Sequence, residues 1–296
     1  MQDYEQLVYT NARGETVIFG IGSPFYVNVQ KDVSGISDLT NTIYSTSSMG
    51  QDGNTYVGNR IEPREIEITG KIYGEDKAGQ LALRRELLRI LNPTIPGRLT
   101  YQFGDFVRYI DAKVLESPSF SHPKLFETFD IRFMCLNPFW YEDSKRVDGG
   151  EWIGAFSFPF EIEQNNSLSM RFGYQSDSNV IVVENDGDMP CGMQVVFAAH
   201  GGDVTNPALR RVGTEQKMKI LTTYSPGDTI TIDTAYGKKS VTLEQAGVST
   251  NIFRLFDVSS SFLQVEPGEN RFLFEAESGL SYMECYILFT PLYLGV

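Results

Sequence analysis

Apolar and polar side chains alternate along several segments of the first half of the chain. In residues 64–73, Ile66, Ile68 and Ile72 alternate with charged or polar neighbours, which predicts a strand with one face in water. Residues 7–10 and 16–19 flank a turn-rich tetrapeptide and predict a hairpin. Further strands are predicted at residues 25–29, 99–103, 107–115 and 126–136.

Residues 79–91 carry the strongest helical pattern. Apolar side chains recur near helical spacing and form a predicted stripe of Leu81, Leu83, Leu87, Leu88 and Leu91. Asn92-Pro93 ends this helix, because a residue that precedes proline avoids helical backbone angles. One helix against an antiparallel sheet predicts an α+β module over residues 1–146.

A polar stretch, residues 34–58, interrupts this module and is rich in Ser, Thr, Asn and Gly. It is too long for an ordinary connection inside a compact domain. Two alternatives follow from the residues: a disordered loop, or an extension that another chain orders.

From residue 180 onward the pattern predicts strands separated by turns. These strands are expected at residues 180–183, 193–198, 218–221, 229–234, 240–243, 252–256, 262–265, 272–274 and 283–289. Short strands with no helix between them predict a β-sandwich over residues 180–296. The pattern weakens over residues 147–179, where we expect a linker with a short pair of strands. The chain as a whole is expected to be mainly β.

Charge narrows the classes of function. The 296 residues include 25 Lys and Arg and 38 Asp and Glu, for a net charge of −13. This balance argues against affinity for nucleic-acid phosphates and against binding to an anionic membrane surface. Residues 1–146 carry 16 basic and 19 acidic side chains, whereas residues 147–296 carry 9 and 19. The start of the sequence lacks the cationic and apolar parts of a secretory signal, and no aliphatic stretch is long enough for a bilayer span, so we expect cytoplasmic synthesis without membrane anchoring.

No catalytic or metal-binding pattern stands out in the sequence. Cys135, Cys191 and Cys285 are widely spaced, which predicts reduced, mostly buried thiols. His122 and His200 have no second ligand at the spacing of a metal site, and there is no Gly-x-Ser-x-Gly nucleophile motif. We therefore expect no enzyme, no cofactor and no bound metal.

Several segments of the first half, in this order and spacing, resemble the N-terminal domain of the distal tail protein of siphophages, the long-tailed, non-contractile bacteriophages. They are residues 64–72, 87–93, 97–101 and 131–140. Segments of the second half resemble that family's C-terminal domain, a galectin-like β-sandwich, and are residues 184–188, 205–209, 227–234, 239–241 and 265–270. The resemblance implies a structural hub without catalysis, built as a ring that is typically hexameric.

The same resemblance implies partners and a place in the virion. Such a ring sits at the distal end of the tail and joins the tail tube protein to the tail-associated or tail-fibre hub protein and to receptor-binding components, while DNA passes only as cargo. In this family an arm embraces the next protomer, so residues 34–58 become a candidate subunit-contact loop. Its candidate contact residues are Asp38, Thr42, Tyr44, Met49, Asp52 and Tyr56.

Two alternatives from other classes stay open at the level of the sequence: a carbohydrate-binding adhesin that acts through the β-sandwich, and a cell-wall hydrolase. Galectins hold galactose with a His, Asn and Arg set and a stacking Trp. Here Asn206-Pro207 lacks the preceding His, and Trp140 and Trp152 lie outside the predicted sandwich. The resemblance is therefore one of fold and not of binding site.

Overall fold

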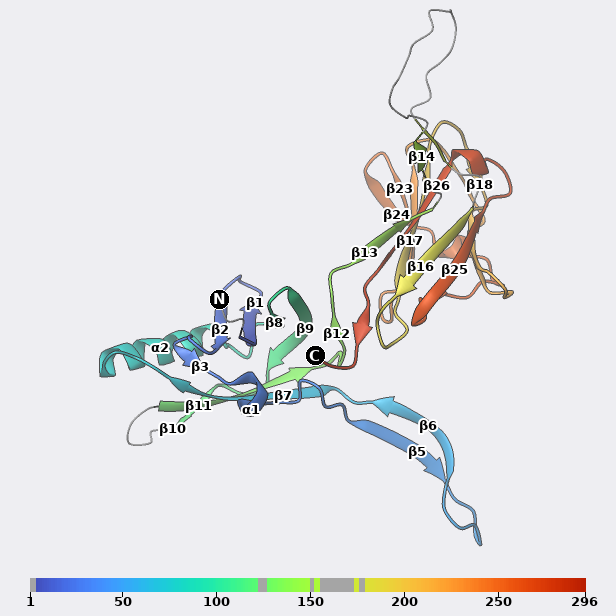
Figure 1. Ribbon diagram of the computed structural model, residues 1–296. Helices are drawn as coiled ribbons and strands as arrows, with labels where there is room; N and C mark the ends of the chain where they lie inside the picture. Colours follow the sequence, from blue (N-terminus) through green and yellow to red (C-terminus); the bar gives the residue numbers. More distant parts are fainter. Residues whose placement is uncertain (1–3, 122–126, 150–151, 155–172, 176–178) are drawn as a thin grey trace, which may run out of the picture. The chain divides into compact units, whose positions relative to one another are not determined.

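The computed structural model describes residues 4–121, 127–149, 152–154, 173–175 and 179–296 (Figure 1). The chain divides into two compact units. The first comprises Met1–Glu142 and Leu292–Val296, and the second comprises Asp143–Pro291. The second unit is therefore inserted into the first. Both units consist mainly of strands, which confirms the predicted predominance of β structure.

The first unit combines strands with one long and one very short helix among its described residues. In chain order its elements are β1 (Gln6–Asn11), β2 (Thr16–Gly20), β3 (Phe25–Tyr26), α1 (Val29–Asp32), β4 (Val33–Ser34), β5 (Asn41–Thr46), β6 (Thr55–Ile61), β7 (Arg64–Ile72), α2 (Lys77–Ile90), β8 (Gly97–Phe103), β9 (Phe106–Val114), β10 (Ser119–Ser121), β11 (Glu127–Cys135), β12 (Trp140–Tyr141) and, from the end of the chain, β27 (Leu292–Tyr293).

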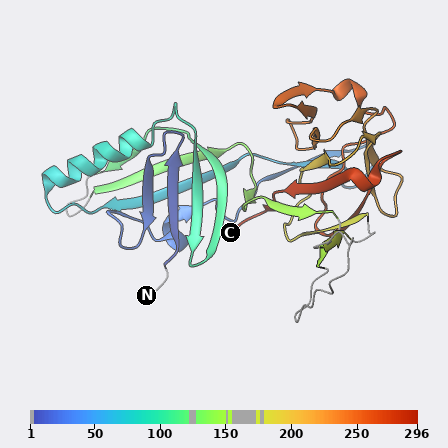
Figure 2. The same ribbon diagram turned by 90° about the horizontal axis from the view of Figure 1, so that it is seen from above.

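The large sheet of the first unit closes on itself. Its strand order is β10-β11-β7-β3-β2-β1-β8-β9-β12-β27, and β11 also pairs with β9. Seven strands, from β11 through β7, β3, β2, β1 and β8 to β9, therefore form a barrel-like ring (Figure 2). The predicted antiparallel sheet with one helix needs two corrections, because the sheet closes and because β2 and β3 pair in parallel. Alternation within a strand carries no information on which distant strand it pairs with.

Alternate residues of the long strands fill the barrel. β7 and β11 pair along nine residues each and alternate between buried and more exposed positions. The rings of Phe19, Phe25 and Phe129 meet with centroids 5.9 to 6.4 Å apart. Tyr9 packs on Phe133 with a centroid distance of 5.1 Å. The predicted half-buried strands are thus confirmed, and their apolar faces share one core.

Helix α2 begins after Asp76, whose side chain accepts a hydrogen bond from the Gly79 N–H at 2.6 Å, an ordinary N-cap. The helix buries Leu87 and Ile90. The predicted apolar stripe is wrong at Leu81 and Leu88, which are 50% and 40% exposed. At 3.6 residues per turn both point roughly 150° away from Leu83, so the stripe merged two different faces of the helix.

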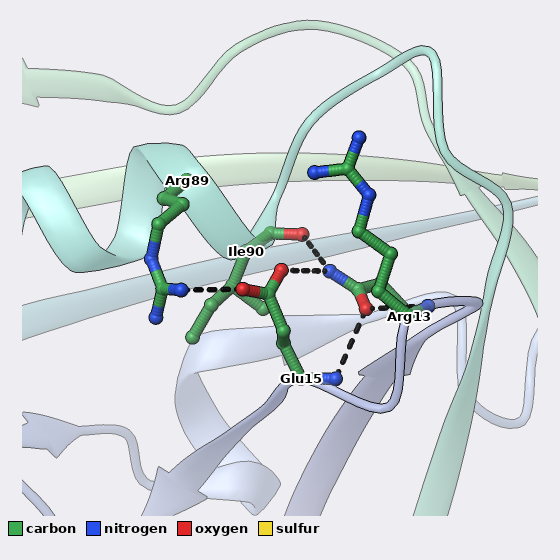
Figure 3. A network of polar contacts seen from close by, with 5 residues as sticks. Arg13, Glu15, Arg89 and Ile90 are labelled. Carbon is green, nitrogen blue, oxygen red and sulfur yellow. Dashed lines mark hydrogen bonds and ion pairs between the residues drawn. The ribbon is translucent and has the colours of Figure 1, made fainter.

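A polar network attaches the end of α2 to the turn between β1 and β2 (Figure 3). Buried Asn11 donates through Nδ2 to the Ile90 carbonyl at 3.1 Å and to Glu15 Oε2 at 2.8 Å. Its Oδ1 accepts the backbone N–H groups of Arg13 and Glu15 at 3.0 and 3.1 Å. Glu15 also pairs with Arg89. Because the last carbonyls of a helix lack donors within the helix, Asn11 satisfies one of them while it shapes the turn.

The second unit consists of antiparallel strands and two short 3-10 helices within its described residues. The elements are β13 (Lys145–Asp148), β14 (Trp152–Gly154), β15 (Gly173–Gln175), β16 (Val180–Asn185), β17 (Met193–Ala199), β18 (Val204–Thr205), β19 (Ala208–Arg211), β20 (Lys217–Lys219), β21 (Thr223–Tyr224), β22 (Thr229–Asp233), β23 (Ser240–Gln245), β24 (Val248–Asn251), η1 (Phe253–Leu255), β25 (Gly268–Glu275), η2 (Leu280–Tyr282) and β26 (Met283–Phe289).

Two sheets make up most of this unit. One has the order β13-β26-β17-β22-β23-β24 and the other the order β16-β25-β19-β20. Two predicted strands are wrong: residues 252–256 contain η1, and residues 262–265 contribute a single bridge between Val265 and Cys191. Short apolar runs of this kind do not distinguish strands from other buried segments. Of the predicted linker, 147–179, most residues lie outside the described ranges, and so does His122.

Candidate functional site

The polar segment of the first unit is a β-hairpin, which we call the arm (residues 41–61) (Figure 1). Its strands β5 and β6 pair from Asn41 opposite Ile61 to Thr46 opposite Thr55, with an irregularity after Tyr44. Among the described strands, β5 and β6 pair only with each other. The predicted disordered loop over residues 34–58 is therefore corrected to a hairpin over residues 41–61, and the alternative, an extension that another chain orders, stays a prediction. Because both faces of the arm meet water, its strands lack the alternation that reveals half-buried strands.

Large apolar side chains of the arm are exposed in the isolated chain. Their exposed fractions run from 47% to 106%, for Ile43, Tyr44, Met49, Tyr56 and Val57. A two-stranded hairpin without a packed face is marginally stable by itself in water. An element with several exposed large apolar side chains is therefore a candidate surface for contact with another molecule.

The structure distributes the six predicted contact residues along the arm and its approach. Thr42 and Tyr44 lie on β5, Tyr56 lies on β6, and Met49 and Asp52 lie in the turn between them. Asp38 precedes β5 and stands apart from the other five.

The predicted contact residues omit two exposed apolar residues of the arm, Ile43 and Val57. Two side-chain hydrogen bonds link residues of the same hairpin: Asn59 donates to Asn41 Oδ1 at 3.0 Å, and the Tyr56 hydroxyl donates to Asn59 Oδ1. Clusters of β-branched and aromatic residues at 42–44 and 55–57 are the signal that could have revealed both strands.

The base of the arm is held by Arg64, the first residue of β7, which is 3% exposed. Its Nε donates to the Pro138 carbonyl at 2.8 Å, and its Nη1 donates to the carbonyls of Gly35, at 2.9 Å, and Ile36. Its Nη2 donates to the Leu294 carbonyl. Desolvation on burial lowers the pKa of this guanidinium. One side chain thus ties together the approach to the arm, the segment after β11 and the last residues described.

The backbone around Arg64 leaves little freedom. Gly35 has φ +81°, and a Cβ there would lie 2.0 Å from the Glu65 carbonyl oxygen, so only glycine fits. The Ile36 carbonyl also accepts the indole N–H of buried Trp140 at 2.9 Å. The approach to the arm is therefore fixed from two sides.

Residues 292–296 are clasped against the same region. β27 pairs with β12. Ser37 donates to the Val296 carbonyl at 2.9 Å, and Arg108 donates to the Gly295 carbonyl at 2.6 Å. The Arg108 guanidinium also lies 3.5 Å from the centroid of the Tyr293 ring. We call Arg64, Arg108, Trp140 and the backbone that they hold the root cluster.

The wet face of β7 and β11 carries charged side chains and borders a concavity of the first unit. A shallow hollow there is lined by polar and charged residues and by two isoleucines: Glu67, Ile68, Thr69, Glu116, Ser117, Ser119, Asp130, Ile131 and Arg132. Arg132 pairs with Glu116 at 2.8 Å, and Thr69 donates to Asp130 at 2.8 Å. This face therefore presents more carboxylates than cations.

Chemistry beyond binding finds little support in the residues that the structure describes. Within those ranges, no three His, Cys, Asp or Glu side chains are grouped so that they could hold a metal ion. Cys135, Cys191 and Cys285 are free and buried, as predicted. Burial raises the pKa of Cys191 to about 11 and that of Cys135 to about 12, so both thiols stay protonated near neutral pH. No helix in the described part of the chain has the length and apolar character of a membrane span.

Each unit matches a family of tail proteins. Residues 13–135 match the phage tail protein RIFT-related domain, and residues 186–291 match the C-terminal domain of the siphovirus-type tail component. The class defined by this pair of domains is the tail proteins of siphophages. The two matches together span more than half of the chain. The chain belongs to the Dit-type distal tail proteins, which are the hub proteins of siphophage tail tips and baseplates.

Solved structures show the same fold over the whole chain. The Dit protein (gp 19.1) of phage SPP1, a hub of the adsorption apparatus in phages that infect Gram-positive bacteria, is similar with a TM-score of 0.64 and 14% identity, over 97% of this chain and 98% of that one. A chain of the phage P2 baseplate in its activated conformation with calcium is similar with a TM-score of 0.51 and 14% identity, over the same shares. No curated protein matches this chain in sequence.

These findings confirm the family predicted from the sequence. The chain is a component of the virion, in the tail tip or baseplate, and its family is structural and generally without enzymatic activity.

Proposed function

We propose that this distal tail protein forms a closed homo-oligomeric ring, a hexamer, in which each arm packs on the neighbouring copy. The observation that carries the proposal is a hairpin with exposed apolar side chains on a base that Arg64 holds in place. A fixed base orients the arm before contact, which lowers the entropy lost on association. A contact between an arm and a different surface of the next copy is head-to-tail, and such contacts generate rings when the rotation closes.

In this ring the arm supplies five of the six predicted contact residues together with two that the structure adds, and the sixth, Asp38, lies on the approach to the arm. Tyr44, Met49 and Tyr56 would bury large apolar surface, and Ile43 and Val57 extend that surface. Burial of about 50 Å² of apolar surface by each of these five side chains would contribute roughly 6 kcal/mol per interface. The polar residues Asp38, Thr42 and Asp52 would set register at the edge of the contact.

The test removes the arm and leaves its root. In the first variant, Asn-Gly replaces residues 44–58, so that Ile43 and Asn59 still face each other across a two-residue turn. The second variant combines Tyr44→Ser with Tyr56→Ser. The matched control is Tyr236→Ser, which changes a tyrosine of the second unit that is 99% exposed.

Light scattering coupled to size-exclusion chromatography measures the outcome. We expect the wild type and the control to run as the ring and both arm variants to run as smaller species. Arm variants that keep the mass of the wild-type oligomer would refute the role of the arm.

We also propose that the second unit, Asp143–Pro291, is a galectin-like β-sandwich that serves as a docking unit for the adhesion apparatus. Sugar binding of the galectin kind is not part of this proposal, because the Asn206 amide is engaged with Glu277 Oε2 at 2.6 Å. The net charge of this half suits protein partners rather than phosphates.

The proposed partners are the tail tube protein on one side of the ring and the tail-associated hub and receptor-binding proteins on the other, at the distal end of the tail. DNA passes through the ring as cargo, and the protein has no catalytic role. The carboxylate-rich face of β7 and β11 supports this view, since a lining of this kind would not retain phosphates.

A further inference from the structure

Three phenylalanines of the second unit form an aromatic surface at one corner of its larger sheet. Phe256 and Phe262 stack with centroids 4.8 Å apart and planes at 16°, and Phe253 stacks on Phe262 at 5.9 Å. Phe253 is 45% exposed, and Phe256 and Phe262 are partly exposed. Nearby Val258 is fully exposed. We call the three rings the phenylalanine platform.

An open sheet edge adjoins the platform. β24 is the last strand of the six-stranded sheet, and all four of its residues are exposed. The Ile252 N–H donates to the Val241 carbonyl, which makes 252 and 241 a hydrogen-bonded pair. Since such pairs alternate along an antiparallel ladder, the backbone N–H and C=O groups of Ser249 and Asn251 point away from β23. Those groups are aligned to receive a further strand.

Cations without ion pairs surround the same corner. In the described part of the second unit, Arg210, Lys219 and Arg271 each pair with a glutamate. Lys238, Lys239 and Arg254 form no ion pair with any described residue, and the same holds for Lys217 and Arg211, although acidic side chains outnumber basic ones in this half of the chain. The Lys239 ammonium lies 5.1 Å from the centroid of the Phe262 ring.

We propose that β24 and the phenylalanine platform bind an extended, acidic segment of another protein, which adds to the sheet as a further strand. Main-chain hydrogen bonds to Ser249 and Asn251 would give affinity in this mode of recognition, and side-chain contacts would give specificity. An apolar side chain of the segment lies on the platform, and its carboxylates face Lys238, Lys239 and Arg254. The inference rests on the proposed docking role of the second unit and names the surface and the chemistry of its partner.

The test uses a ribosome-displayed library of random 12-residue peptides selected on the full chain, followed by fluorescence anisotropy of the enriched peptides. We expect enriched sequences in which Asp or Glu occurs among β-branched and aromatic residues. Ser249→Pro removes one outward N–H group, and Lys239→Glu reverses one charge; each is expected to weaken binding at least tenfold. Lys113→Glu, an exposed cation of the first unit, is the charge-matched control and is expected to leave affinity unchanged.

Two outcomes overturn the inference: no enrichment of acidic peptides, or enriched peptides that bind Ser249→Pro and Lys239→Glu as tightly as the wild type. Light scattering on the same samples separates this result from the ring. If the wild type forms the ring but the peptides bind both variants as tightly as the wild type, only the docking surface is refuted. A monomeric wild type whose peptides still depend on Lys239 and Ser249 refutes the ring and supports the docking surface.

Discussion

Arg64→Met is expected to destabilise the first unit and to leave the second unit unchanged. Methionine keeps much of the length of the side chain but donates no hydrogen bond. The carbonyls of Gly35, Pro138 and Leu294 would lose the donor that the guanidinium supplies to them. The Ile36 carbonyl would retain the Trp140 indole.

The size of the effect follows from these bonds. A hydrogen bond to a charged group contributes about 1.5–3 kcal/mol net, so three of them contribute roughly 5–9 kcal/mol. Removal of a buried cation returns several kcal/mol of desolvation, the same effect that lowers the pKa of Arg64. We expect a net loss of about 3 kcal/mol. For a unit of this size the loss corresponds to a fall in Tm of roughly 10 °C.

Differential scanning calorimetry is the assay, because the chain has two compact units and the prediction concerns one of them. Arg64→Lys keeps the charge, but a single ammonium cannot reach acceptors on three sides, so we expect an intermediate fall in Tm. Arg85→Met on the exposed side of α2 is the control and is expected to shift Tm by less than about 2 °C. A shift below about 3 °C for Arg64→Met, or an equal fall in both transitions, would refute the reasoning.

Two further predictions concern buried polar groups. Asn11→Ala is expected to lower the free energy of unfolding of the first unit by about 2 kcal/mol, since the Ile90 carbonyl and the turn lose their hydrogen bonds to this side chain. Glu15→Gln is expected to lower it by less than about 1 kcal/mol. Equal losses for the two variants in urea denaturation would contradict the role of Asn11. Burial raises the pKa of Cys191 from 9.0 to about 11, so its contribution to stability is complete below pH 9 and is lost as the pH rises toward 11, at up to about 1.4 kcal/mol per pH unit. Cys191→Ala should flatten the alkaline loss of stability in urea titrations, and an unchanged slope would count against this cause.

Strands with one face in water were predictable, because every second side chain is buried and the polarity of the sequence alternates with the same period of two residues. β7 and β11 follow from alternation alone, and that alternation already places Arg64 on the buried face with Ile66 and Ile68. The acceptors of Arg64 were not predictable, because Gly35, Pro138 and Leu294 are backbone partners far apart in the chain.

The strands of the arm and the edge strand β24 of the second unit were not predicted, because their sequences do not show the alternation of a half-buried strand. Tyr44 and Tyr56 sit on strands whose two faces are both in water, so no apolar period marks them. The apolar runs at 252–256 and 262–265 led to two predicted strands. Their phenylalanines, Phe253, Phe256 and Phe262, instead form the phenylalanine platform beside β24. Residues that serve a partner follow the partner's geometry rather than the period of their own core.

The discontinuity of the first unit has a consequence for biosynthesis. Leu292–Val296 complete the root cluster, yet they leave the ribosome only after the whole of Asp143–Pro291. At about 5–20 residues per second, translation of that insertion takes roughly 7–30 s, during which Arg64 lacks its Leu294 acceptor. A nascent chain thus holds its arm on an unfinished base until the second unit has been made. If the arm binds a neighbouring copy as proposed, a subunit whose synthesis stops within the second unit would present its arm on a loosened base and would assemble poorly.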